Sequence, residues 1–133
     1  MRVKDIMYTR LFKVPFDATV DAAAKMMDEN NIGALLVEKD NKNIGIVTEW
    51  DIVRSVTAQE KDPKEVTVDE IKSYPLIIID SEFDILEAAE LMQRHDIRRL
   101  MVVDHGKIVG IISTNIICNN IVPILKEKTH TTD

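Results

Sequence analysis

The sequence is poor in the residues that build disulfide frameworks, metal sites and phosphate loops. Its single cysteine, Cys118, excludes a disulfide within the chain, and no cysteine or histidine cluster has zinc spacing. With only four glycines there is no glycine-rich phosphate loop, and no nucleophile elbow or histidine placed beside a serine is found. We therefore expect a protein of a reducing, cytoplasmic compartment that is not an enzyme and requires no cofactor or metal.

Long apolar runs and an excess of basic residues are also absent. The longest apolar runs, such as Leu76–Ile79, have the length of a strand, and the amino terminus lacks the pattern of a signal peptide. With 17 Lys and Arg against 23 Asp and Glu, the net charge is −6. Because nucleic acids and anionic membranes bind basic surfaces, we expect neither as a partner. An apolar share of 45% is ample for a folded core.

What the sequence does contain is an internal duplication. The second copy lies 65 positions after the first and aligns with it without a gap, as Val3 and Val68 illustrate. Repeated apolar and glycine positions indicate two similar folding units, each covering the hydrophobic face of the other. The matched residues of the first copy are Val3, Ile6, Leu11, Ala23, Ala24, Met27, Ile32, Leu35, Val37, Gly45, Ile46 and Ile52.

Each copy predicts the same order of elements: short helix, strand, helix, strand, strand, helix. The main helix of the first copy is predicted to begin at a Thr19 cap, and that of the second at Asp84. The boundaries are one unit over residues 1–58, a charged linker over 59–65, a second unit over 66–125 and a frayed polar tail over 126–133. Pro123 is expected to kink or end the last helix.

The segment Gly45–Ile52, which closes a unit of this element order, resembles the cystathionine β-synthase (CBS) domain, and two such units resemble a tandem CBS pair, or Bateman module. The resemblance covers residues 1 to about 125. It implies an α/β fold in which two repeated units pack about a pseudo-twofold axis and leave two related clefts. Such clefts often hold adenine nucleotides or other adenosyl ligands, and such pairs commonly dimerise through their helices.

Thr48 and Asp51 have two interpretations. If Thr48 ends a strand and Asp51 lies in the first turn of the next helix, a hydroxyl and a carboxylate converge, and the carboxylate can accept both hydrogens of a ribose diol. The resemblance implies this role for Asp51. The alternative is that Thr48 caps the helix and Asp51 stabilises its dipole, with no ligand involved.

The second copy differs from the first at the positions that matter for such a ligand. Ile116 replaces Asp51, and Arg98 and Arg99 stand where the first copy has Gly33 and Ala34. The resemblance implies that these arginines reach the phosphates of the nucleotide whose ribose Asp51 holds. Because a guanidinium forms a fixed fork of donors, paired arginines suit phosphate. A solvated strand edge is the alternative for both.

The remaining site residues follow by analogy with the family. An apolar slot for the base is expected from Ala34, Ile46 and the strand residues Leu76, Ile77 and Ile78, and Trp50 either borders the ribose or packs against its own helix.

The sequence leaves two functions open. One is a regulatory module that binds AMP, ADP, ATP or another adenosyl compound in the cleft and signals to a separate effector protein. The other is a ligand-free scaffold that acts as a homodimer. Dimerisation is expected because the closing helices offer more apolar surface than one small pair covers. These apolar residues are Ile52, Val53, Val56, Ile117, Ile121 and Leu125.

Overall fold

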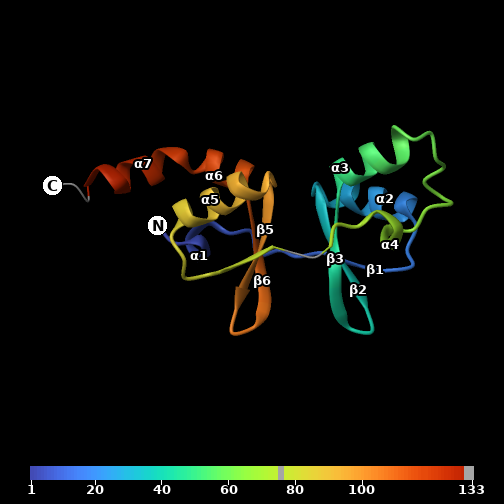
Figure 1. Cartoon of the computed structure of the whole chain (residues 1–133), viewed down its shortest axis with the longest axis horizontal. Coiled ribbons are helices and arrows are strands. Elements are labelled where there is room, and N and C mark those ends of the chain that lie inside the picture. Colours follow the sequence, from blue (N-terminus) through green and yellow to red (C-terminus); the bar gives the residue numbers. More distant parts are fainter. Residues whose placement is uncertain (75–76, 131–133) are drawn as a thin grey trace. The chain divides into compact units, whose positions relative to one another are not determined.

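The computed structural model describes residues 1–74 and 77–130 and contains two compact α/β units, each with a hydrophobic core. The first-repeat unit is formed by Phe12–Leu76, and the second-repeat unit by Met1–Leu11 together with Ile77–Asp133. Each contains a three-stranded sheet with helices (Figure 1). The predicted α/β class and the predicted repetition of one unit are confirmed.

The first-repeat unit is built on the sheet β1-β2-β3, with β1 Lys13–Pro15, β2 Ala34–Lys39 and β3 Lys42–Thr48. β1 runs parallel to β2, to which it is connected through helix α2 (Val20–Asn30), and β3 returns antiparallel to β2. The turn between β2 and β3 is formed by Asp40 and Asn41, both with positive φ, as a tight hairpin turn requires. After β3 the chain forms α3 (Glu49–Ile52) and a π-helical turn, η1 (Val53–Thr57).

The second-repeat unit repeats this plan with β4 (Ile78–Asp80), α5 (Ile85–His95), β5 (Arg99–Asp104), β6 (Lys107–Ser113) and α6 (Thr114–Asn119). Thr19 and Asp84 cap α2 and α5 as predicted, accepting hydrogen bonds from the backbone N–H groups of Ala22 and Leu86. The α2 and α5 helices end at Asn31 and Asp96, each in the left-handed conformation. The two copies of the sequence therefore begin and end their main helices in the same way.

The short opening helices are exchanged between the repeats. Helix α1 (Val3–Ile6) belongs to the second-repeat unit, where Val3 is fully buried, and α4 (Val68–Ile71) belongs to the first-repeat unit, where Val68 is fully buried. Figure 1 shows α1, in blue, beside α5, and α4, in yellow-green, beside α2. The compact units thus differ from the sequence repeats at their beginnings.

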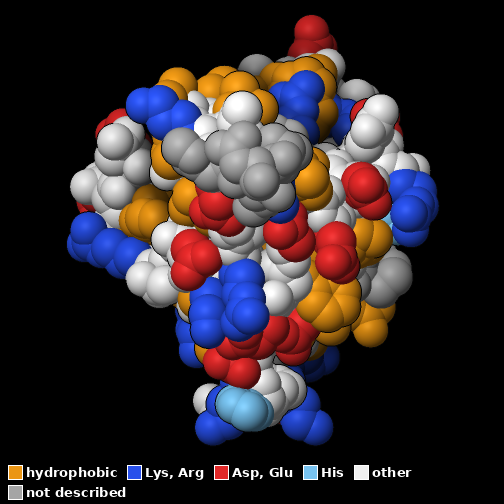
Figure 2. Space-filling model, turned by 90° about the vertical axis from the view of Figure 1, so that its left-hand side faces the viewer, with side chains coloured by type: hydrophobic (Ala, Val, Ile, Leu, Met, Phe, Trp, Pro, Cys, Tyr) orange, Lys and Arg blue, Asp and Glu red, His pale blue; other side chains and the backbone are white. Residues whose placement is uncertain are grey.

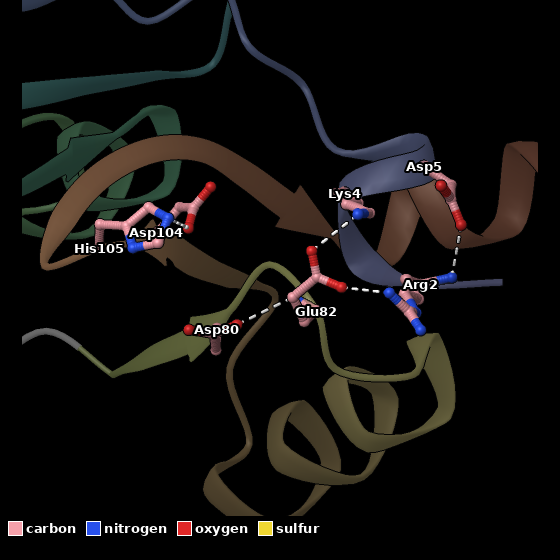
Figure 3. Close-up of polar contacts among 7 residues, drawn as sticks. All are labelled: Arg2, Lys4, Asp5, Asp80, Glu82, Asp104 and His105. Atoms are coloured by element: carbon pink, nitrogen blue, oxygen red, sulfur yellow. Dashed lines mark hydrogen bonds and ion pairs between the residues drawn. The ribbon is translucent and has the colours of Figure 1, made fainter.

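Polar contacts fix α1 within the second-repeat unit. The side chains of Arg2 and Lys4 both pair with the carboxylate of Glu82, the Lys4 distance being 2.7 Å (Figure 3). The two cations and their hydrogen bonds hold the pKa of Glu82 below its usual range, mainly through Lys4. The Val3 amide also donates to the Phe83 carbonyl at 2.8 Å.

The end of the chain differs from the expectation. The helix breaks at Asn120 rather than at Pro123, and α7 (Ile121–His130) continues through residues that were expected to form a frayed polar tail. Pro123 lies in the first turn of α7, where its missing N–H costs nothing. Ile124 is buried, the terminal ammonium of Met1 pairs with Glu127, and Lys128 pairs with Asp84 at 2.8 Å.

Three residues of the expected dimer surface are also placed differently. Val56 is buried inside the first-repeat unit. Ile52 and Ile117 are half-buried, and each packs against the core of its own unit. Val53, Ile121 and Leu125 remain exposed. In the part of the chain that the structure describes, every helix is too short or too polar to span a lipid bilayer.

Candidate functional site

The candidate site lies at the corner between β3 and α3 of the first-repeat unit. Thr48 is the N-cap of α3: its hydroxyl accepts a hydrogen bond from the Asp51 amide at 3.2 Å. Oδ2 of Asp51 accepts from the Thr48 amide at 2.8 Å and from the Thr48 hydroxyl at 3.0 Å. The two side chains do converge as predicted, and they do so as a capping box.

Ser73 completes this corner and was not found by sequence reasoning. Its backbone N–H donates to the Ile46 carbonyl at 2.8 Å, which adds residue 73 to the free edge of β3. Its hydroxyl lies 3.5 Å from Oδ1 of Asp51, the oxygen that the cap does not use. Thr48, Asp51 and Ser73, which we call the polar corner, therefore come from segments 22 residues apart in sequence.

A glycine allows Ser73 to come this close. A Cβ on Gly45 would lie 2.9 Å from the carbonyl oxygen of Ser73 and equally close to the Lys72 side chain. Gly110 has the same role in the second-repeat unit, where a Cβ would lie 3.0 Å from the carbonyl oxygen of Tyr8. The repetition of this glycine in both copies was the available signal that another segment packs against each third strand.

The second-repeat unit builds the same corner without a carboxylate. The Ser113 hydroxyl caps α6 by accepting a hydrogen bond from the Ile116 amide at 3.1 Å. Ile116 has no carboxylate, so the reciprocal hydrogen bond of a capping box is missing. Tyr8 occupies the bridging position beside Ile111 that Ser73 occupies beside Ile46. The two units therefore share a backbone arrangement and differ in chemistry: the first-repeat corner has the Asp51 carboxylate and a serine at the bridging position, where the second-repeat corner has Ile116 and Tyr8.

The predicted base-slot residues divide between the two units. Ala34 pairs with Thr48 in the sheet, and Ile46 is almost fully buried on β3, so both lie next to the polar corner. Trp50 is exposed, with the Arg54 guanidinium 5.9 Å from its ring centre. Ile77 and Ile78 belong to the second-repeat unit, and Leu76 lies outside the described residues.

Arg98 and Arg99 lie at the start of β5 in the second-repeat unit. Arg98 is exposed and its carbonyl accepts from the Thr114 amide at 3.0 Å, while Arg99 is half-buried and pairs with Ser113. At the corresponding place in the first-repeat unit, a Cβ on Gly33 would lie 2.8 Å from a carboxylate oxygen of Glu49. One unit thus has cations where the other has an anion. The combination of these arginines with Asp51 in one site stays a prediction.

Within residues 1–74 and 77–130, no three carboxylate, histidine or cysteine side chains are grouped so that they could hold a metal ion.

Two α/β units of this order, each with a capped strand-to-helix corner, define a duplicated α/β module. The sequence model of the CBS domain matches residues 3–58 and 68–122, and the chain belongs to this family. The CBS domain-containing protein YhcV of Bacillus subtilis is 35% identical over 111 residues, which are 84% of this chain and 79% of that protein. The predicted tandem CBS pair is confirmed.

Solved structures of CBS proteins have the same fold. A protein with CBS domains from Burkholderia ambifaria superimposes with a TM-score of 0.86 at 32% identity, covering 92% of this chain and 95% of that one. A CBS domain protein from Pyrobaculum aerophilum, complexed with AMP, gives a TM-score of 0.83 at 26% identity, covering 97% and 99%. The chain spans about half the length (51%) of an uncharacterised relative from Methanopyrus kandleri, to which it is 37% identical over 100 residues.

Proposed function

We propose that this chain is a regulatory module that binds an adenine nucleotide or a related adenosyl ligand, with the ribose at the polar corner. The observation that carries the proposal is the different use of the two carboxylate oxygens of Asp51. Oδ2 is held by the two Thr48 donors, whereas among the described residues Oδ1 has only the distant Ser73 hydroxyl beside it. A carboxylate oxygen has two acceptor sites, so Oδ1 keeps capacity for a ribose hydroxyl.

The cap that holds Asp51 also prepares it for a ligand. Since both Thr48 donors fix the carboxylate plane, little side-chain entropy is lost when a ribose binds. Ser73, held by its backbone at the edge of β3, offers a hydroxyl that both donates and accepts. Together these groups match the two neighbouring hydroxyls of a ribose. The AMP complex of the Pyrobaculum aerophilum relative supports this choice of ligand.

Charge supports an anionic ligand rather than a nucleoside. We propose that Arg98 and Arg99 bind the phosphates, as the family resemblance implies, because guanidinium groups bind phosphate with paired, charge-assisted hydrogen bonds. Glu49, which lies over Gly33 at the matching place in the first-repeat unit, would repel a phosphate there. We expect one nucleotide to bind per chain. AMP, ADP and ATP would be distinguished by how far their phosphate groups extend toward the arginines.

Regulation by such a module requires self-association or a partner that responds to the ligand. The exposed residues Val53, Ile121 and Leu125 lie on the closing helices, and homodimerisation would bury them. A separate effector protein would then receive the signal. We propose no catalytic activity: the Asp51 carboxylate, although it lies near the Thr48 and Ser73 hydroxyls, is engaged in the cap of α3.

A ligand-free scaffold is the second candidate, and one observation favours it. The capping box alone accounts for the conformation of Thr48 and Asp51. Thermal unfolding with a panel of AMP, ADP, ATP and adenosine separates the two functions, because a ligand that binds only the native state raises stability by about 2.7 kcal/mol at 100 times its Kd. A nucleotide-dependent rise in Tm supports the sensor, and unchanged Tm with all four compounds supports the scaffold.

A further inference from the structure

A groove of about 490 Å³ lies in the first-repeat unit between η1, the linker that follows it and α4. Figure 1 draws this linker in light green, leading from η1 to α4. The volume falls in the range of small-molecule sites. The buried Val66 and the half-buried Ile71 form the apolar part of the lining. Thr48, Asp51 and Ser73 of the polar corner are not among the described residues that line the groove.

Charged side chains of both signs line this groove. Arg54 and Lys61 are its cations. Arg54 lies on η1, and the backbone N–H of Lys61 donates to the Val56 carbonyl at 3.0 Å, which fixes residue 61 at the end of η1. Glu65 and Glu70 are its anions, the first at the end of the linker and the second on α4. The cations therefore come from the η1 side of the groove and the anions from the α4 side.

These charges are not used up by contacts within the protein. Acidic and basic side chains lie next to one another on the face that Figure 2 shows. In the groove, by contrast, the side chains of Lys61 and Glu65 take part in no hydrogen bond or ion pair with the described residues 1–74 and 77–130. Glu70 uses one oxygen, Oε2, to accept from the Thr67 amide. The groove therefore keeps a cation and carboxylate oxygens available to a ligand.

The backbone beside the groove has two unusual features. η1 is a π-helical turn, in which the Ala58 amide donates to the Val53 carbonyl, five residues back, at 2.8 Å. Such turns are rare and are frequently found at functional sites. Glu60, next to Lys61, has a φ of +57°, a conformation that costs energy for a residue with a side chain. At the corresponding place in the second-repeat unit, the described chain forms the α-helices α6 and α7.

We propose that this groove binds a small zwitterion with an apolar side chain, of the class of the free apolar amino acids. The carboxylate of the ligand pairs with Lys61 and Arg54, because cationic side chains form charge-assisted hydrogen bonds with carboxylates. Its ammonium group pairs with Glu65 and Glu70, and its side chain lies on the apolar part of the lining. A ligand with only one sign of charge meets like charges on one side of the groove. The inference goes beyond nucleotide binding and does not depend on it.

Isothermal titration calorimetry of the full chain with leucine, methionine, valine and phenylalanine tests the proposal. At least one of the four should bind, and glycine, which lacks the apolar side chain, should bind more weakly. The N-acetyl and amide derivatives of the amino acid that binds remove its ammonium and its carboxylate charge, one at a time. Each should bind about ten-fold or more weakly. A derivative that binds as well as the free amino acid, or the absence of binding by all four, overturns the proposal.

Two single variants test whether the amino acid lies in this groove. Lys61→Glu and Glu65→Lys should each raise its dissociation constant about ten-fold or more, because each brings a like charge to the ligand. Lys107→Glu on the β5–β6 hairpin and Glu90→Lys on α5 are the matched controls and should leave it unchanged. All four side chains are exposed, and circular dichroism verifies that each variant is folded. Binding that is unchanged in both Lys61→Glu and Glu65→Lys overturns the inference.

Discussion

At the scale of single residues, Asp51 combines a structural and a proposed binding role, and a second capping box separates them. In the same unit, Glu70 accepts from the Thr67 amide at 2.8 Å, the distance at which Asp51 accepts from the Thr48 amide. Asp51→Ala should weaken AMP binding by about 1.5–3 kcal/mol, the range for a hydrogen bond to a charged group. Losing the cap should cost about 0.5–2 kcal/mol of stability.

Glu70→Ala is the control for this prediction. It should lower the free energy of unfolding by a similar amount and leave the AMP affinity unchanged, because Glu70 takes no part in the polar corner. Urea unfolding and calorimetry on both variants provide the comparison. Equal affinities for AMP in both variants would show that Asp51 is a helix cap only.

The two arginines allow phosphate recognition to be separated from recognition of the nucleoside. Converting Arg98 and Arg99 together to alanine should reduce the affinity for AMP and ATP and leave that for adenosine nearly unchanged, since the polar corner is intact. Because a guanidinium–phosphate contact is charged, added salt should weaken AMP binding more in the wild type than in the variant. Calorimetry with AMP and adenosine on both proteins gives the four values needed. An equal loss for both ligands would assign the arginines to the fold or to the base slot.

The sequence predicts some of these residues and misses others for a physical reason. Thr48 and Asp51 are close in sequence, so their convergence follows from one strand end and one helix turn. Ser73 is reached only through the pairing of its backbone with the edge of β3 at Ile46, a contact between distant segments. The difference between Ser73 and its counterpart Tyr8 is visible in the alignment of the copies, but its meaning depends on that pairing.

At the scale of elements, the docking of α7 is predicted to depend on pH. Hydrogen bonds from Lys128 and from the Leu86 backbone hold the pKa of Asp84 below its ordinary value of 3.8. A carboxylate whose pKa is lower in the folded state stabilises the fold fully above the unfolded pKa, and this contribution is lost as the pH falls through the folded pKa. We expect thermal stability to decline below about pH 4, and the decline to be smaller in Lys128→Ala.

Unfolding followed by circular dichroism between pH 3 and 6 measures this difference. The pair is partly exposed, so the effect is expected to be small and to shrink in high salt. Lys107→Ala, the same change on the exposed β5–β6 hairpin, serves as the control. A Lys128→Ala profile identical to the wild type would indicate that the pair between Lys128 and Asp84 does not stabilise the docked helix.

The sequence predicted the helix starts that depend only on residues close to one another in the chain. The caps at Thr19 and Asp84 act over a few residues, and the structure has them as expected. The helical conformation of residues 126–130 could not be predicted in this way. Their helix is docked by Ile124 and by ion pairs to Met1 and Asp84, partners that are distant in the sequence.

At the scale of the whole molecule, duplication explains both the repetition and the asymmetry. The two sheets and their glycines are repeated, whereas the opening helices α1 and α4 are each packed in the unit of the other repeat. As a consequence, Ser73, from the second copy of the sequence, lies beside Asp51, from the first, in the proposed binding corner. A sequence alignment of the repeats identifies which residues differ. The exchange of the opening helices between the units determines which of these residues lie close together.

The central claim is that one chain binds one adenine nucleotide through the corner of the first-repeat unit. Calorimetric titration of the wild-type chain with AMP, repeated on Asp51→Ala and on Ser113→Ala, tests it most directly. Ser113→Ala removes the equivalent cap of the second-repeat unit, in which Ile116 replaces the carboxylate. The account predicts one site per chain, weakened by Asp51→Ala and retained with its affinity in Ser113→Ala. Two equal sites per chain, or binding that survives Asp51→Ala unchanged, would contradict it.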